Sequence, residues 1–259
     1  MTEGFVATTD GRVHYVEAGS GAPLILLHSV GSSVYEFEDV MEALSAHQRV
    51  IAWDMPGHGD SDPLPRHYSI EDYAGAVIRL MDALNIERAS VLGESIGGPI
   101  CAALGADHAD RIERLIFCES PLRTEADWAA NWGRVEGNFG IPESTLEQLE
   151  SRMRAPTAEF VTRWNIDRNK AGAHRMVDAM WAIREYDIYA ALPQVRAPSL
   201  ALFGAKGAFV PAGKDVELAK LANNADLVVL QESGHFPMVD EPEAFASAVN
   251  AFVAQEAAV

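Results

Sequence analysis

The 259-residue sequence has only two cysteines, Cys101 and Cys118, which excludes a fold held together by a disulfide framework. It also has no apolar segment long enough to span a bilayer, and no basic leader followed by an apolar stretch that would indicate a signal peptide. We therefore expect two buried free thiols and a cytoplasmic protein.

Basic residues are scarce as well, since 20 Lys and Arg stand against 38 Asp and Glu and give a formal net charge of −18. Such a surface repels nucleic-acid phosphates and anionic lipid headgroups, so both kinds of partner are disfavoured. The hydrophobic fraction of 48% is typical of a globular chain that buries one large core. We expect a monomer or a homodimer that acts on a small molecule.

Short apolar runs, typical of strands buried on both faces, recur along the chain and alternate with segments of helical spacing. After a polar lead-in and a hairpin-like strand at Arg12–Glu17, these runs are Pro23–His28, Val50–Asp54, Ala89–Gly93, Arg114–Glu119, Ser199–Gly204 and Asp226–Gln231. The alternation predicts an α/β fold with a mostly parallel sheet covered by helices.

One interval, residues 122–193, lacks strand-like runs and is rich in tryptophan and methionine. We interpret it as a helical cap inserted into a core domain of residues 1–121 and 194–259. Its aromatic residues either fill the core of the cap or line a pocket beneath it. Trp181 is the favoured substrate contact, because its indole N–H can reach a substrate oxygen while its ring packs on carbon. The predicted substrate contacts are Trp128, Trp132, Met153, Trp181 and Phe236.

The strongest chemical signal is the Gly-x-Ser-x-Gly pattern centred on Ser95, directly after a predicted strand and before a helix-like run. A serine at a sharp strand-to-helix turn projects its hydroxyl above the carboxyl edge of the sheet, and Gly93 and Gly97 leave room for that turn. The next amide, Ile96 N–H, lies at a helix N-terminus and is a candidate oxyanion donor. The sequence therefore predicts Ser95 as a nucleophile.

A serine hydroxyl needs a base, and His235 follows the last predicted strand, where catalytic groups gather in open parallel sheets. A metal site made of His28, Asp54 and His58 is the alternative use of the histidines, but their spacing does not favour it. We expect neither a metal nor a cofactor.

The chain order of nucleophile, acid and histidine, together with the sheet pattern, resembles the α/β-hydrolase superfamily over nearly the whole sequence. The resemblance implies an eight-stranded, mostly parallel sheet with a helical cap. Members commonly carry the acid in a Gly-x-x-Asp-x-x-x-Pro segment, but Gly207 stands at that position here. Glu119, at the end of the preceding core strand, lies at the same sheet edge as Ser95 and is the predicted acid. Asp215 is the alternative.

The second oxyanion donor of the superfamily comes from the loop after the third strand. That loop reads Leu27-His-Ser-Val-Gly-Ser32 in this chain, so the backbone N–H of Ser29 or of Val30 is the candidate donor. The sequence does not choose between them.

Three short motifs are similar to motifs of the zearalenone lactonases, which also place the acid after the strand that precedes the cap. They are the Asp-Met-Pro-Gly turn ending at Gly57, the Cys-Glu-Ser-Pro segment beginning at Cys118 and the His-Phe-Pro segment beginning at His235. The second matches the Cys-x-Glu-x-Pro motif of the lactonases with a shift of one residue. The resemblance implies an apolar lactone as substrate. Dehalogenases and epoxide hydrolases of this fold need an aspartate where Ser95 stands, so they are disfavoured.

Other activities fit the same residues. A general carboxylesterase or a carbon–carbon bond hydrolase differs only in its pocket. A cofactor-free dioxygenase of this fold can also place its acid after the same strand. The non-enzymatic alternative is a ligand-binding protein that descends from a hydrolase and has lost its activity. The presence of Ser95, Glu119 and His235 together speaks against the last of these.

Overall fold

The computed structural model describes residues 1–9, 11–207 and 209–255, and its centre is one eight-stranded sheet. The strands are β1 (Thr2–Thr8), β2 (Gly11–Ala18), β3 (Pro23–Leu27), β4 (Arg49–Trp53), β5 (Ala89–Glu94), β6 (Ile112–Cys118), β7 (Ser199–Gly204) and β8 (Asp226–Leu230). Their order in the sheet is β1-β2-β4-β3-β5-β6-β7-β8. β2 is antiparallel to both of its neighbours, β1 and β4, and β3 to β8 are parallel to one another. The chain therefore has the predicted α/β-hydrolase fold.

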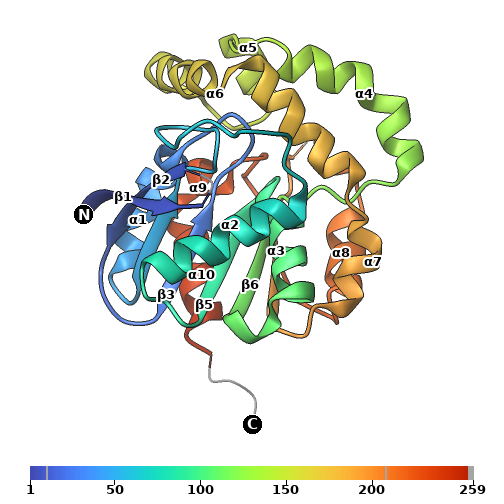
Figure 1. Cartoon of the computed structure of the whole chain (residues 1–259). Coiled ribbons are helices and arrows are strands. Elements are labelled where there is room, and N and C mark those ends of the chain that lie inside the picture. Colours follow the sequence, from blue (N-terminus) through green and yellow to red (C-terminus); the bar gives the residue numbers. More distant parts are fainter. Residues whose placement is uncertain (10, 208, 256–259) are drawn as a thin grey trace.

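The apolar runs became central strands because both of their faces are covered. Leu24 to Leu27 of β3 and all residues of β5 are buried. One face packs against α2 (Ile70–Ala83), α3 (Gly97–Asp107) and α8 (Lys214–Leu221), and the other against α1 (Glu38–Ser45) and α10 (Pro242–Val253). Figure 1 shows this layered arrangement, with α2 and α3 in front of the sheet and α10 behind it.

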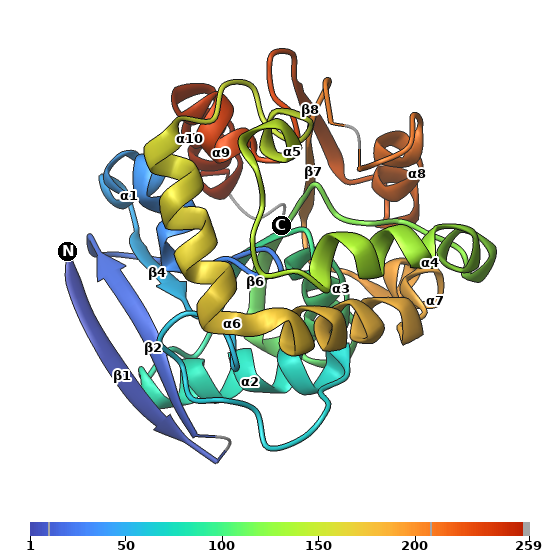
Figure 2. The same cartoon turned by 90° about the horizontal axis from the view of Figure 1, so that it is seen from above.

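The remaining helices fill the interval between β6 and β7. They are α4 (Glu125–Phe139), α5 (Leu146–Glu150), α6 (Ala158–Glu185) and α7 (Ile188–Ala191), and the short helix α9 (Pro237–Asp240) follows β8. Capping boxes start α4 at Thr124 and α5 at Thr145, where a threonine hydroxyl and a side chain three residues later satisfy free amides. In Figures 1 and 2, α4, α5 and α6 lie together above the sheet, and α6 crosses it with α4 alongside. The division into core and cap domains stays a prediction.

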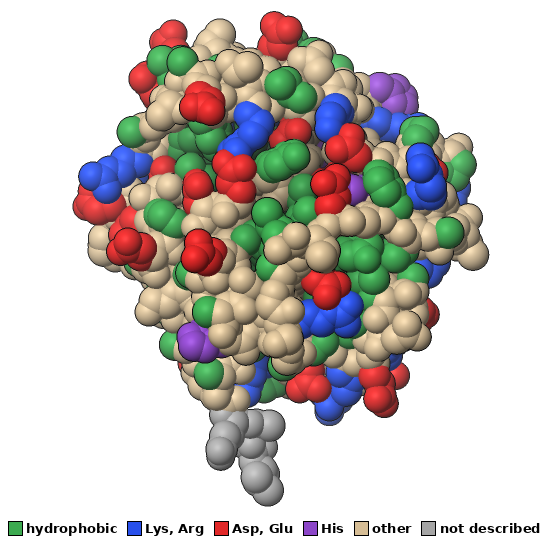
Figure 3. Space-filling view, turned by 90° about the vertical axis from the view of Figure 1, so that its left-hand side faces the viewer, with side chains coloured by type: hydrophobic (Ala, Val, Ile, Leu, Met, Phe, Trp, Pro, Cys, Tyr) green, Lys and Arg blue, Asp and Glu red, His purple; other side chains and the backbone are tan. Residues whose placement is uncertain are grey.

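The polar lead-in is not irregular, because Thr2–Thr8 forms β1 at the edge of the sheet. Its side chains are exposed or half-buried, which explains why hydrophobic periodicity did not reveal it. On the face shown in Figure 3, acidic and basic side chains are both scattered among apolar ones. Among the residues that the structure describes, no helix is both long and apolar enough to cross a bilayer.

Candidate active site

Ser95 stands on a strained turn between β5 and α3, with a φ of 53° that only glycine adopts without strain. The turn is tight because Gly93 approaches the next helix closely; a Cβ at Gly93 would lie 2.0 Å from Gly97 O. Two backbone hydrogen bonds hold it, from Ser95 N–H to Cys118 O at 2.9 Å and from Gly98 N–H to Ser95 O at 2.9 Å. The strain fixes the serine at the carboxyl edge of the sheet.

His235 lies beyond β8 in the same pocket as Ser95. Its Nδ1 lies 3.1 Å from Glu119 Oε2. A carboxylate oxygen only accepts, so Nδ1 carries the proton and Nε2 is left free to act as a base. Nε2 faces the turn of the nucleophile, 3.7 Å from Oε1 of Glu94, the residue before Ser95.

No hydrogen bond joins Ser95 Oγ to His235 Nε2 among the described contacts. Proton transfer between them therefore requires a side-chain rotation or a small movement of the ring. Hydrogen bonds of this kind often tighten only when substrate binds.

Glu119 also has a positive φ, of 45°, and is almost completely buried. Its N–H donates to Leu202 O at 3.1 Å, and its Oε1 accepts the N–H of Gly204 at 2.6 Å. Both bonds come from β7, so the neighbouring strand fixes the orientation of the carboxylate toward His235. The alternative acid, Asp215, lies in the first turn of α8, and no described contact joins it to His235.

Glu94 is a residue of the site that the sequence analysis did not single out. It is fully buried, and neither of its carboxyl oxygens has a hydrogen-bond partner among the described residues. Burial, followed by the carboxylates of Glu36 and Glu119, raises the pKa of Glu94 well above its usual range. Burial therefore disfavours the ionised form of this carboxyl group beside His235.

The two candidate donors after β3 differ in the structure. The N–H and hydroxyl of Ser29 both donate to the buried carboxyl group of Glu36, with the N–H at 3.0 Å from Oε1. Neither Val30 N–H nor Ile96 N–H has an acceptor among the described hydrogen bonds, and Val30 lines the pocket beside Ser95. Val30 and Ile96 are therefore the open donors, and Ser29 supports the loop.

The pocket brings together only part of the predicted substrate contacts. Trp128 and Phe236 line it, whereas Trp132, Met153 and Trp181 are not among its lining residues. Trp181 is 36% exposed and packs on Trp132, with ring centroids 4.3 Å apart, while Met153 is buried in the core. Further apolar walls come from Val135, Phe139, Trp164, Met180, Ile183, Phe209 and Val210.

Polar residues of the pocket were also missed. Arg123, Asn131, Arg134, Asn138 and Arg152 all line it. Three of them share one face of α4 with Trp128, at the spacing of three or four residues that places side chains on one side of a helix. That spacing in the sequence could have indicated that the three residues of α4 lie on the same side of the helix as Trp128.

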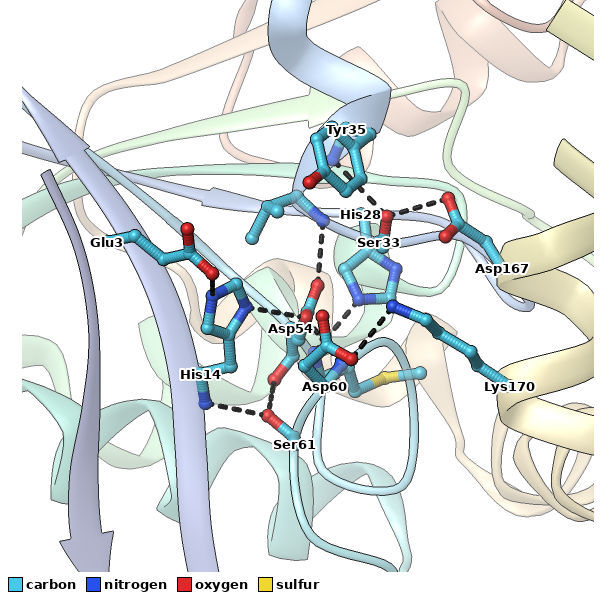
Figure 4. Close-up of polar contacts among 12 residues, drawn as sticks. Glu3, His14, His28, Ser33, Tyr35, Asp54, Asp60, Ser61, Asp167 and Lys170 are labelled. Carbon is cyan, nitrogen blue, oxygen red and sulfur yellow. Dashed lines mark hydrogen bonds and ion pairs between the residues drawn. The ribbon is translucent and has the colours of Figure 1, made fainter. Parts of the chain in front are cut away.

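The turn after β4 is held by a polar network beside the pocket, centred on Asp54 (Figure 4). Asp54 accepts hydrogen bonds from His14 Nδ1 at 2.7 Å and from the amides of Val34 and Asp60, both at 2.8 Å. His28 donates from Nδ1 to Ser29 O at 2.7 Å and accepts Met55 N–H at Nε2 at 2.9 Å. These bonds fix the loops that carry Val30 and the Asp-Met-Pro-Gly turn.

The hydrogen bonds also bear on metal binding. Both ring nitrogens of His28 are occupied, and His58 is buried outside the pocket lining. One oxygen or nitrogen atom each from His14, Asp54 and Asp60 lie within 4.8 Å of one another, but Asp60 pairs with Lys170 at 2.8 Å and His14 pairs with Asp54. His14, His28, Asp54 and Asp60 already have protein partners, whereas neither ring nitrogen of His58 has one among the described residues. The absence of a metal requirement stays a prediction.

Known proteins resemble this chain along most of its length. The family model described as alpha/beta hydrolase fold matches residues 22–140. The pimeloyl-[acyl-carrier protein] methyl ester esterase of Neisseria meningitidis serogroup A is 30% identical over 240 residues, 88% of this chain and 75% of the esterase. The 2-hydroxy-6-oxo-2,4-heptadienoate hydrolase of Pseudomonas putida is 28% identical over 258 residues, 93% of this chain and 92% of that hydrolase. The solved enol-lactonase from Burkholderia xenovorans LB400 superimposes with a TM-score of 0.82 at 27% identity, over 97% of this chain and 100% of the lactonase.

Proposed function

Because this chain belongs to the α/β-hydrolase family, we propose that it hydrolyses a carboxylic ester or a lactone through an acyl-enzyme on Ser95. One observation carries the proposal: His235 Nδ1 lies 3.1 Å from Glu119 Oε2 in the pocket that Ser95 lines. Because Nδ1 faces Glu119, Nε2 of His235 is free to act as a base, and it faces the turn that carries Ser95.

In the proposed reaction, Ser95 Oγ attacks the substrate carbonyl while His235 Nε2 accepts its proton. Glu119 stabilises the resulting imidazolium through the Nδ1–H hydrogen bond. The N–H groups of Ile96 and Val30 bind the oxyanion, because they have no protein acceptor among the described contacts. His235 then protonates the leaving alkoxide, and water repeats the cycle on the acyl-enzyme.

A lactone is the favoured substrate within this class, and a zearalenone-type lactone is the first one to test. Support comes from the three lactonase-like motifs and from the acid after β6, at Glu119. The similarity to an enol-lactonase points to the same bond type. When a lactone opens, the leaving alcohol stays attached to the acyl part, so one molecule of product carries both new groups.

Covalent labelling tests the nucleophile. We expect a fluorophosphonate probe to label the wild type and not Ser95→Ala. Labelling of Ser95→Ala at the same rate would place the nucleophile elsewhere. A panel of lactones and 4-nitrophenyl esters then identifies the bond, and loss of these activities in Ser95→Ala links them to the site.

Carbon–carbon bond hydrolysis is the second candidate function. It is favoured by the similarity to 2-hydroxy-6-oxo-2,4-heptadienoate hydrolase, which extends over nearly the whole chain. Vinylogous diketones in the same panel separate the two candidates. Oxygen uptake with heteroaromatic substrates tests the dioxygenase alternative, since neither hydrolysis consumes oxygen.

A further inference from the structure

Three arginines line the candidate active-site pocket of this acidic protein. Arg123, Arg134 and Arg152 all line the pocket that contains Ser95 and His235, although the chain has a net charge of −18. The overall field of such a protein repels anions. A cluster of positive charge inside this one pocket therefore needs an explanation of its own.

Arg152 is the central member of the group because it is only 7% exposed and no described hydrogen bond or ion pair involves its guanidinium. The buried Arg168 differs, since its Nη2 donates to the carbonyls of Asn138 and Ile141. A buried cation without an acidic partner is costly. Burial, followed by the charge of Arg134, lowers the pKa of Arg152 to about 10, so the group still carries its charge at neutral pH.

The guanidinium of Arg152 is placed close to the reacting groups. It lies over the ring of Phe209, 5.0 Å from the centroid, and the same ring lies 5.0 Å from the imidazole of His235. The backbone carbonyl of Arg152 accepts the N–H of His235 at 2.6 Å. Arg152 is thus fixed relative to His235 by its side chain and its backbone.

The other two arginines approach from the cap. Arg134 is an exposed residue on the face of α4 that lines the pocket, and the half-buried Arg123 donates from Nη2 to Phe209 O at 2.8 Å while lying over Trp128. None of the described ion pairs involves Arg123, Arg134 or Arg152. Three guanidinium groups that take part in no described ion pair, next to apolar walls, form a site for a group that brings its own negative charge.

We propose that the substrates of this pocket carry a free carboxylate, which Arg152 and Arg134 bind while Ser95 attacks an ester or lactone carbonyl elsewhere in the same molecule. The proposal rests on the proposed hydrolase function and replaces a purely apolar substrate by an acidic one. The apolar walls then contact the carbon chain between the two groups.

Two esters that differ only in charge test the substrate class: 4-nitrophenyl hydrogen adipate and 4-nitrophenyl methyl adipate. We expect the wild type to prefer the acid by about tenfold or more in kcat/KM, because a desolvated guanidinium–carboxylate pair is strong. Arg152→Met, which keeps the packing on Phe209, and Arg134→Met should each reduce the ratio of the two kcat/KM values. Taking the ratio within one variant cancels general damage to the site.

Arg154→Met is the matched control, because Arg154 is exposed, lies two residues further along and does not line the pocket. It should keep the wild-type ratio. Equal kcat/KM values for the two esters in the wild type would overturn the proposal. So would an unchanged ratio in both Arg152→Met and Arg134→Met.

Binding separates this proposal from the hydrolase function. Calorimetry with Ser95→Ala should show that monomethyl adipate binds more tightly than dimethyl adipate, and that adding Arg152→Met removes the difference. If neither ester is hydrolysed but this difference is present, the carboxylate site stands and the proposed function fails. If the neutral ester is hydrolysed and the binding difference is absent, the carboxylate site fails alone.

Discussion

The carboxylate of Glu119 fills the space beside Gly207. A Cβ at Gly207 would lie 3.1 Å from Glu119 Oε2, the oxygen that faces His235 Nδ1. In the superfamily pattern that this sequence resembles, an aspartate stands at the position of Gly207. The two positions therefore approach the same ring nitrogen from neighbouring strands, and a side chain at Gly207 would require the Glu119 carboxylate to shift.

Removal of the charge at Glu119 should reduce turnover strongly. We expect Glu119→Gln to lower kcat by about a thousandfold to ten-thousandfold, because the amide no longer stabilises the imidazolium or selects the tautomer. Circular dichroism should show a folded protein. Asp215→Asn is the control and should keep wild-type activity. The reverse result, an active Glu119→Gln and an inactive Asp215→Asn, would move the acid to α8.

An acid at position 207 should restore part of the activity lost at position 119. In the Glu119→Ala background, Gly207→Asp places a carboxylate in the vacated space, and the φ of Gly207 is not in the left-handed region. We expect kcat to rise by about tenfold or more over Glu119→Ala, as measured in a double-mutant cycle. Gly207→Asn in the same background is the uncharged control. Equal rates for the Asp and Asn variants would show that no functional acid can act from this position.

The tryptophans Trp128 of α4 and Trp181 of α6 should differ in their effect on kinetics. Trp128 is 4% exposed and lines the pocket, so Trp128→Ala should raise KM by about tenfold through lost apolar contact. Trp181 packs on Trp132 outside the pocket lining, so Trp181→Ala should leave both KM and kcat within about twofold. Thermal unfolding of both variants separates stability from binding. A larger kinetic effect at Trp181 would show that α6 adopts another arrangement in solution.

The pH dependence of stability should report Glu36. Burial is the main reason that the pKa of Glu36 is raised to about 7 in the folded chain, above its usual value of 4.5. The folded state therefore favours the protonated form, whose contribution is complete below the unfolded pKa and is lost as the pH rises through about 7. The free energy of unfolding should fall by about 3 kcal/mol as the pH rises from the unfolded pKa of Glu36 to its folded pKa.

Glu36→Gln should remove that part of the slope while keeping an acceptor for Ser29. Denaturant unfolding at several pH values between about 4 and 8 measures it. Asp39→Asn, at an exposed neighbouring position, should keep the wild-type slope. An unchanged slope in Glu36→Gln would mean that Glu36 is ionised in the folded protein.

The central sheet was predictable because its signals are local. Strands β3 to β7 appear as short apolar runs, since burial on both faces leaves no polar side. The edge strand β8 has the same apolar run, although it is only partly buried. The Gly-x-Ser-x-Gly pattern identified Ser95 as the candidate nucleophile. Glu119 and His235 were then chosen by the rule that the carboxyl ends of parallel strands meet at one edge. The edge strand β1 was missed because solvent covers much of it.

The pocket was less predictable because it depends on how α4 and α6 are rotated over the sheet. Trp181 and Trp128 have the same residue type, yet one faces outward and the other lines the pocket. Arg134 and Arg152 are of a residue type that usually lies at the solvated surface. Only the packing of α4 and of the segment after α5 places them in the lining of the pocket that contains His235. The choice between Ser29 and Val30 depended on the buried acceptor Glu36, which lies seven residues from Ser29 along the chain.

The hydrogen bond from His235 N–H to Arg152 O joins the loop of the proposed base to the segment between β6 and β7. The segment between β6 and β7 therefore contributes walls to the pocket and also holds the backbone of His235 in place. A chimaera that received the corresponding insertion from another hydrolase would need to supply a carbonyl at the same point, or the imidazole would lose its backbone anchor. Exchange of substrate preference by grafting is thus constrained by the geometry of catalysis itself.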